Sequence, residues 1–492
     1  MKFLLKKQHL TKLLFLFFAF LYYIFFANKI LSLFDEGYFA HLAQRISIGE
    51  VPYKDFSLQY GPTYIYLLAG LYKIFGTSLI VGRYLNIIIC VFIVGFVFAI
   101  LNRIHIGNKK VWILSFLSLI SFGYPLINIT HLIWASVLSV TLSIYLAICI
   151  LTSQERKIRL EVLLGISIAV SLSLKQNFGI FLIVAILPYL YFMTTYSLSE
   201  KIKSLLTISS VVVVLTFFWL YLFFFADNIQ GLRDFYVFSK TFAQKMMFSY
   251  PPLSIALQPF GVFKLIPYYL PLILVPIIFV GLIKKTFNKS ILLFSIISVG
   301  CFIVSVYPQS DLIHCYPFFG LVLVSILLLS YQSTWRLVAI PVVFLSIIIG
   351  FYLTFFTKAY RYESYYFEKS TTLPFERARG ISLDVINAKT ITEAGNYIQA
   401  HTTKDDYIFS YPHEPMFYFL LDRKNPSRDI VYFLRYWHFY DDEVIINEIL
   451  SKKTKYIIAS GNYVNDSKLS SFIQQQKIVY KTRGYTIFSI GY

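Results

Sequence analysis

The chain has 492 residues, of which 57% are hydrophobic, 19% aromatic and 14% charged. Soluble domains carry about 25% charged residues, so the composition excludes an ordinary soluble protein and indicates an integral membrane protein. The formal charge of +19 does not indicate a nucleic-acid partner, because the lysines and arginines gather in alternate loops between apolar runs. The four cysteines show no paired spacing, which excludes a disulfide framework and a zinc motif.

The first apolar run, residues 13–34, is too long for the core of a signal peptide and lacks a small-residue cleavage site, so we interpret it as a retained anchor. A membrane span needs about 20 apolar residues. Further candidate spans are 79–101, 111–127, 132–151, 162–174, 178–196, 205–226, 264–283, 290–306, 317–331 and 337–356. These runs predict about eleven spans. Residues 162–174 are short for a crossing, and the alternative is a re-entrant segment formed with the next run.

The distribution of basic residues predicts the orientation. Lysines precede the first run, and basic clusters follow every second run, as in 109–110, 156–159 and 284–289. By the positive-inside rule the N-terminus is cytoplasmic, and the long loops and the C-terminal tail face outside. We therefore expect a multi-pass protein of the cytoplasmic (inner) membrane.

Composition shifts near Phe356. We predict a membrane-embedded region over 1–356 and an extracytoplasmic α/β domain over 357–492, because the tail alternates short apolar strands with helical stretches. The expected strands are 407–410, 455–459 and 485–490, and the expected helices are 414–421 and 443–450. The predicted fold class is a polytopic α-helical membrane protein with a small C-terminal α/β domain.

The first outer loop, 35–78, contains two amphipathic stretches. Tyr38, Leu42 and Arg45 share one helical face, a pattern typical of a helix lying flat in the membrane interface. Gly49 and Pro52 end this helix. A second amphipathic run, 63–75, leads into the next span.

Four acidic residues lie in this loop: Asp35, Glu36, Glu50 and Asp55. No acidic residue lies inside an apolar run, which argues against a proton- or ion-coupled transporter. Asp35 is placed to cap the first helix, with Glu36 favouring its dipole. Capping is compatible with catalysis, because a capped helix holds its carboxylate rigidly. Asp55 is either a turn aspartate that binds its own backbone or part of a site.

Two polar segments between later spans are further candidates. Lys175 follows run 162–174 and either snorkels or binds a lipid phosphate with Gln176 and Asn177. Asp311 and His314 share a helical face; they bind a metal, orient a sugar, or belong to a solvated loop.

At these residues the chain resembles GT-C glycosyltransferases, and more narrowly the bacterial relatives of protein O-mannosyltransferases and lipid A aminoarabinose transferases. The resemblance covers nearly the whole chain. It rests on Asp35-Glu36-Gly37-Tyr38, Gly49 to Asp55, Gly61-Pro62, Leu174-Lys175-Gln176, the Asp311…His314 loop, and tail segments 411–415 and 418–426.

The resemblance implies a sugar donor carried on a polyprenyl phosphate, reached from within the bilayer. The acceptor, a lipid, glycan or protein, comes from outside with a hydroxyl or amine. Asp35 is then the catalytic carboxylate, with Glu36 beside it. The substrate-binding set is Asp55, Tyr60, Lys175, Gln176, Asp311 and His314. Many members have a further acidic pair in the second outer loop, but residues 123–130 have none, so the need for a divalent metal, the one cofactor considered, stays open.

The implied chemistry fits one main carboxylate. A phosphate leaving group carries its charge well, so it needs cations rather than a proton donor. Asp35 as base and Lys175 at the phosphate would suffice, and direct displacement inverts the anomeric centre. The alternatives are an O-antigen polymerase or ligase, for which loop 227–263 offers Arg233 as its only arginine, and a lipid-linked sugar flippase or transporter.

Overall fold

The computed structural model describes residues 2–121, 129–225, 231–232, 250–258, 261–306, 312–331, 336–356, 368–412, 414–430, 442–461 and 467–491. Most of them are helical. The apolar runs fall on α1 Lys2–Ile24, α4 Leu79–Arg103, α5 Asn108–Ser121, α6 Ile133–Leu151, α7 Ile158–Leu174, α8 Gln176–Met193, α9 Leu198–Leu220, α11 Gly261–Lys284, α12 Lys289–Val306, α13 Leu312–Ser330 and α14 Arg336–Phe356. A π-helical turn, Tyr221–Phe225, extends α9, and a 3-10 turn, Leu253–Leu257, precedes α11.

Within the described residues, six helices are long and apolar enough to cross a membrane: α4, α6, α8, α9 with its π-helical turn, α11 and α12. The apolar parts of α1, α13 and α14 are shorter. The polytopic helical fold is confirmed, whereas the number of spans stays a prediction. The structure shows α7 as one continuous helix of 17 residues packed against α6 and α9, and whether it crosses the membrane or is re-entrant stays a prediction.

The first predicted span is longer than its helix. The apolar run extends to residue 34, but α1 ends at Ile24. The following segment turns back against α4, where the carbonyls of Ala27, Lys29 and Ile30 accept hydrogen bonds from the guanidinium of Arg83. These carbonyls point at a buried cation instead of at the next turn of a helix, so the helix cannot continue through them.

Small polar side chains let two helices of the bundle approach closely. Ser143 Oγ lies 2.8 Å from Ser167 Oγ, and Ser171 Oγ donates to Ser139 Oγ at 2.8 Å, both between α6 and α7. Helices in lipid associate through such close packing and hydrogen bonds, because lipid is as apolar as leucine.

The C-terminal region is built on a four-stranded sheet of order β3-β4-β6-β5. Its strands are β3 Ile408–Tyr411, β4 Tyr456–Ser460, β5 Lys477–Lys481 and β6 Tyr485–Ser489, and its helices are α15 Val385–His401, α16 Met416–Leu421, α17 Asp442–Ser451 and α18 Lys468–Gln474. Strands β3 and β4 are parallel, and the other pairs are antiparallel. All five elements expected from the sequence are present. The helices α15 and α18, strand β5 and a short pair, β1 Ser370–Thr372 with β2 Ser382–Asp384, were not expected.

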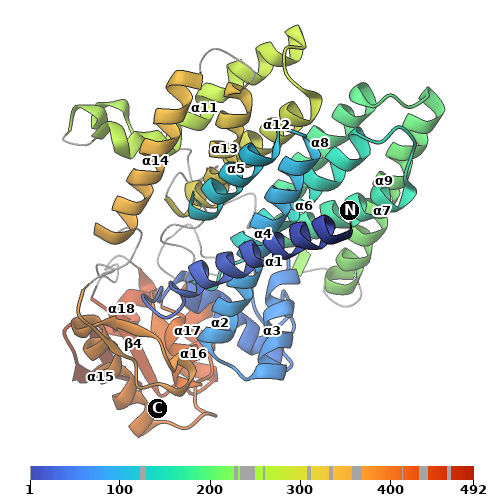
Figure 1. Ribbon diagram of the computed structural model, residues 1–492. Coiled ribbons are helices and arrows are strands. Elements are labelled where there is room, and N and C mark those ends of the chain that lie inside the picture. Colours follow the sequence, from blue (N-terminus) through green and yellow to red (C-terminus); the bar gives the residue numbers. More distant parts are fainter. Residues whose placement is uncertain are drawn as a thin grey trace.

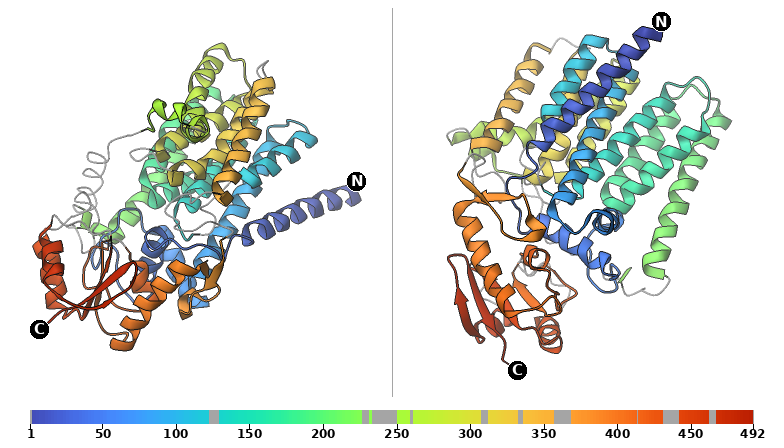
Figure 2. Two further views of the ribbon diagram at one scale, coloured as in Figure 1. Left: turned by 90° about the vertical axis from the view of Figure 1, so that its left-hand side faces the viewer. Right: turned by 60° about the horizontal axis from the view of Figure 1, so that its bottom comes forward.

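The two faces of this sheet bury different cores. One face, with Phe409, Ile457 and Phe488, packs against α17 and α18. The other face, with Ile458 and Ile487, joins α15 and α16 in a core that is continuous with the membrane helices. Figures 1 and 2 show the sheet region at one end of the helical bundle, and Figure 2 shows the two chain ends far apart.

The first loop folds into α2 Asp35–Ser47 and α3 Thr63–Phe75, which lie between the bundle and the sheet region (Figure 1). Residues Glu36–Ile46 of α2 are all buried in protein, so its apolar face does not meet lipid as the sequence suggests; that α2 lies flat at the membrane surface stays a prediction. A side chain at Gly37 would place its Cβ 2.5 Å from Met416 N, so α2 and α16 touch through backbone. The ring of His41 stacks on Tyr418 at 4.8 Å.

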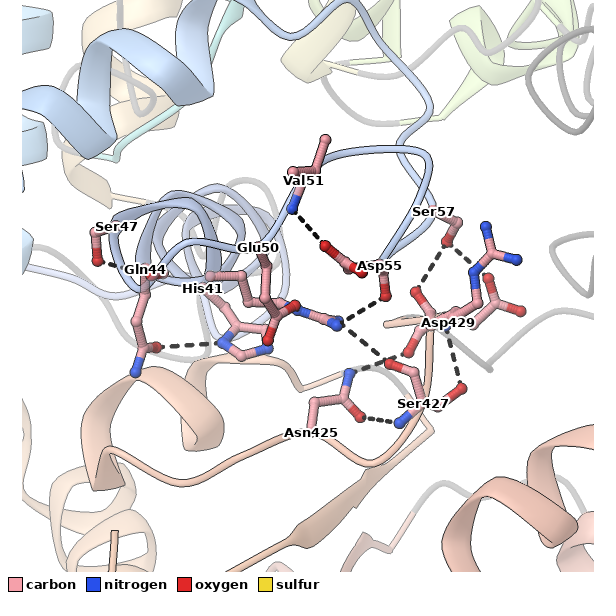
Figure 3. A network of polar contacts seen from close by, with 12 residues as sticks. His41, Gln44, Ser47, Glu50, Val51, Asp55, Ser57, Asn425, Ser427 and Asp429 are labelled. Carbon is pink, nitrogen blue, oxygen red and sulfur yellow. Dashed lines mark hydrogen bonds and ion pairs between the residues drawn. The ribbon is translucent and has the colours of Figure 1, made fainter. Parts of the chain in front are cut away.

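A polar network continues this contact (Figure 3). Arg45 of α2 donates to the carbonyls of Ser427 and Asp55. Ser57 Oγ donates to Asp429 Oδ1 at 2.7 Å, and the Arg428 guanidinium donates to the Tyr53 carbonyl at 2.8 Å. The segments around residues 45–57 and 427–429 therefore form one polar contact.

Candidate active site

A small cavity lies where the first loop, the start of α6, the α7–α8 junction and the start of α13 converge. It is lined by Tyr60, His131, Leu132, Ile133, Lys175 and His314. Three of these, Tyr60, Lys175 and His314, are predicted site residues that come from distant parts of the sequence. The cavity is rich in nitrogen donors, so its electrostatics suit an anion.

Backbone packing explains why Lys175 lies beside Tyr60. Lys175 is extended, with φ −146° and ψ 104°, and separates α7 from α8. A side chain at Gly61 would collide with the carbonyl of Ser173, and Thr63 Oγ1 donates to Ser173 Oγ at 2.7 Å. The first loop therefore lies directly on the end of α7. The ammonium of Lys175 lies 6.0 Å from the centre of the Tyr60 ring, at the outer limit of a cation–π contact.

Asp35 is the first residue of α2 and is partly exposed. It is not the N-cap that the sequence suggests: Phe34 holds that position, and Ser32 Oγ accepts the Asp35 N–H at 3.1 Å. One turn along the same helix face, the Phe39 ring meets the His131 ring edge-on at 4.8 Å. Asp35 and Lys175 therefore belong to the same end of the bundle.

Glu36 has a different environment from its neighbour. Its carboxylate is fully buried and pairs with the guanidinium of Arg83, also fully buried, at 2.6 Å and 2.8 Å. Its Oε1 also accepts from the N–H and hydroxyl of Thr130, at 3.1 Å and 3.3 Å. A carboxylate with no exposed surface and these partners has no face left for a substrate. We therefore move Glu36 from the predicted catalytic set to a supporting role.

The contacts of Asp55 favour the alternative in which it is a turn aspartate that binds its own backbone. Its carboxylate accepts the Val51 N–H at 2.7 Å within its own turn, and its carbonyl accepts from Arg45. It does not line the cavity. The turn geometry accounts for an aspartate here without a substrate.

The polar residues after Lys175 differ in their availability. Asn177 is engaged, since its amide donates to the Val304 carbonyl and its Oδ1 accepts the Phe178 N–H. The Oε1 atom of Gln176 is buried and has no partner among the described residues. Asp311 lies outside the described residues, as do residues 123–128 and Arg233.

His131 is the polar cavity residue that was not predicted from the sequence; the apolar Leu132 and Ile133 beside it were not predicted either. Burial lowers the pKa of His131 well below the usual range, and the nearby His314 and Lys175 lower it further. In the sequence, His131 is a histidine directly before an apolar run on the predicted outer side. This position alone does not distinguish a site residue from an ordinary loop residue. Among the described residues no three His, Cys, Asp or Glu side chains lie close enough together to hold a metal ion.

Comparison with protein-family models gives no match, and neither does comparison with curated proteins. Solved structures give strong matches. The crystal structure of ArnT from Cupriavidus metallidurans bound to undecaprenyl phosphate covers 98% of both chains with a TM-score of 0.58 at 11% identity. The structure of ArnT from the same organism in the apo state covers 98% of both chains with the same TM-score at 10% identity. The chain therefore has the fold seen in ArnT over nearly its whole length, which confirms the GT-C-like fold that the resemblance implies.

Proposed function

We propose that this protein is a membrane glycosyltransferase that moves a sugar from a polyprenyl-phosphate carrier to an acceptor hydroxyl or amine. The observation that carries the proposal is the convergence of Lys175, His131 and His314 on one cavity, next to the face of α2 that begins with Asp35. The ArnT neighbour was crystallised with undecaprenyl phosphate, and a donor-rich cavity in the same fold suits such a phosphate.

In this mechanism the acceptor oxygen or nitrogen attacks the anomeric carbon while the bond from that carbon to the phosphate oxygen breaks. Asp35 takes the acceptor proton, and the phosphate leaves with the bonding electron pair toward Lys175. A single displacement inverts the anomeric centre. Tyr60, Gln176 and His314 are proposed to position the donor headgroup.

We place the cavity at the outer face of the cytoplasmic membrane, with the N-terminus inside and the sheet region outside. The support is charge: the basic cluster 156–159 lies at the start of α7, the end of that helix opposite Lys175. The acceptor is then an envelope lipid, glycan or protein.

The test uses the full-length protein in nanodiscs, given undecaprenyl-phosphate-linked radiolabelled monosaccharides and envelope extracts as acceptor. Wild type should transfer label, and the transfer rate of Asp35→Asn should be about 10²- to 10⁴-fold lower, which is the usual contribution of a general base to the rate. Asp55→Asn is the matched control and should stay within a few-fold of wild type. Full activity of Asp35→Asn at normal abundance would remove Asp35 from the mechanism.

The competing envelope functions give different results in the same system. A polymerase or ligase should use a diphosphate-linked oligosaccharide and ignore the monophosphate donor. A flippase should move the labelled lipid between leaflets without covalent transfer.

A further inference from the structure

His131 occupies a position whose chemistry is fixed by its surroundings. It lies two residues before the start of α6 and shares the cavity with Lys175 and His314. Its ring packs edge-on against Phe39 of α2 at 4.8 Å with an interplanar angle of 71°. The ring therefore contacts the helix that begins with Asp35 and lines the same cavity as the lysine proposed to bind phosphate.

One nitrogen of this ring is already used. The N–H of Ile133 donates to His131 Nδ1 at 3.0 Å. A nitrogen that accepts a backbone N–H carries no proton, so the neutral ring carries its proton on Nε2. Protonating Nδ1 would set two N–H groups against each other. His131 in this arrangement can therefore donate a hydrogen bond through Nε2–H, but it cannot take up a second proton at Nδ1.

The backbone before His131 is also fixed. Thr130 donates its N–H and its hydroxyl to Glu36, and Glu36 is held by the guanidinium of Arg83. Because Glu36 adjoins Asp35 in sequence, a single carboxylate fixes both the proposed base and the residue preceding His131. The separation of base and imidazole is thus set by buried, paired groups.

We propose that His131 is a neutral hydrogen-bond donor, through Nε2–H, to a phosphate oxygen of the polyprenyl-phosphate carrier. This inference rests on the proposed function. His131 transfers no proton in the reaction: the acceptor proton goes to Asp35, the carbon–oxygen bond breaks, and the departing phosphate keeps the electron pair. A donor that stays uncharged adds a directed hydrogen bond without placing a second cation beside Lys175.

The experiment measures binding of undecaprenyl phosphate to the purified full-length protein in nanodiscs, with undecaprenol as the control for the tail alone. Two variants distinguish the effect of the hydrogen-bond donor from the effect of the shape of the side chain. His131→Phe keeps a ring against Phe39 but has no donor, whereas His131→Gln supplies an amide donor of similar reach. We expect affinity to fall about ten- to a hundredfold in His131→Phe, the worth of a hydrogen bond to a charged group. His131→Gln should stay within about threefold of wild type.

Three outcomes would overturn the inference. They are wild-type affinity in His131→Phe, an equal loss in both variants, and a wild-type dependence of affinity on pH between 5.5 and 8 that His131→Gln removes. The last result would show that His131 itself titrates. If wild type binds undecaprenyl phosphate no better than undecaprenol, the proposed function fails instead. Thermal midpoints of both variants, measured in parallel, identify a loss caused by misfolding.

Discussion

Two arginine–glutamate pairs, each with a fully buried carboxylate, lie at opposite ends of the bundle. At the cavity end, Arg83 and Glu36 are both fully buried. At the other end Arg156 pairs with Glu161 at 2.8 Å; Glu161 is fully buried, but Arg156 keeps 16% of its side chain exposed. Helix α6, which runs between the two ends, has 19 residues, a length of about 28 Å.

The two arginines differ in the groups to which they donate hydrogen bonds. All five N–H donors of Arg83 are used, two by Glu36 and three by the carbonyls of Ala27, Lys29 and Ile30. Arg156 instead reaches Thr207 Oγ1 and the Lys203 carbonyl on α9. The first pair fixes the residues around the cavity, and the second closes α7 onto α9. The same chemistry therefore serves the site at one end and helix packing at the other.

The largest effect is expected from breaking the cavity pair. Glu36→Gln leaves a buried guanidinium without a counter-charge, which costs about 3–5 kcal/mol, so abundance and transfer should both collapse. The double variant Glu36→Leu with Arg83→Met tests whether the pair does more than hold the fold. Apolar replacement of a whole pair is often tolerated, so thermal stability should recover while transfer stays low. Recovery of transfer in the double variant would make the pair purely structural.

The distal pair should behave differently. Glu161→Gln leaves Arg156 partly solvated, so we expect a smaller loss of stability, about 1–3 kcal/mol. The turnover of the protein that remains folded should match wild type, measured as transfer per folded molecule. A lower transfer per folded molecule in Glu161→Gln would show that the distal pair also supports the reaction, and the proposed difference between the two ends would then be wrong.

The contact between α2 and α16 offers a further test of the cavity end, because a substitution at this contact displaces α2 from the side that faces α16. Gly37→Ala drives a methyl group against the backbone of Met416, and overpacking of this kind costs about 1–3 kcal/mol. Gly70→Ala in α3 is the matched control, because a Cβ there meets nothing within 4 Å and alanine favours a helix by up to about 1 kcal/mol. Thermal midpoints should therefore move in opposite directions. Equal shifts would mean that α2 and α16 do not touch as described.

The smallest effect concerns acid stability at the same contact. Burial, followed by the nearby Arg45, lowers the pKa of His41 to about 3, below the usual value of about 6.5. The unfolded chain therefore binds a proton first, and stability should fall as the pH drops from about 6.5 toward 3, while above 6.5 this group has no effect. His41→Phe should flatten that slope in thermal midpoints recorded from pH 7 to 5. An unchanged slope would assign the acid sensitivity elsewhere.

Much of the fold is readable from the sequence because apolar runs in a membrane protein have few alternatives to helix. The site was readable in part. Lys175 stands out as a polar residue after an apolar run, whereas Tyr60 was named only with the resemblance, and their meeting depends on Gly61 fitting against Ser173, a contact that no periodicity reveals. Glu36 looked equivalent to Asp35, since a buried partner 47 residues away leaves no local pattern. The amphipathic pattern of α2 was real, but its apolar face meets protein instead of lipid.

The glycine at position 37 has a consequence for engineering. Because α2 carries the proposed base on one side and seats α16 on the other, the two surfaces have to be exchanged together. A chimera that takes its tail from a relative should lose activity unless residues 35–62 travel with residues 414–430. Grafting both segments as a unit keeps the close contact between α2 and α16 and so leaves Asp35 in place.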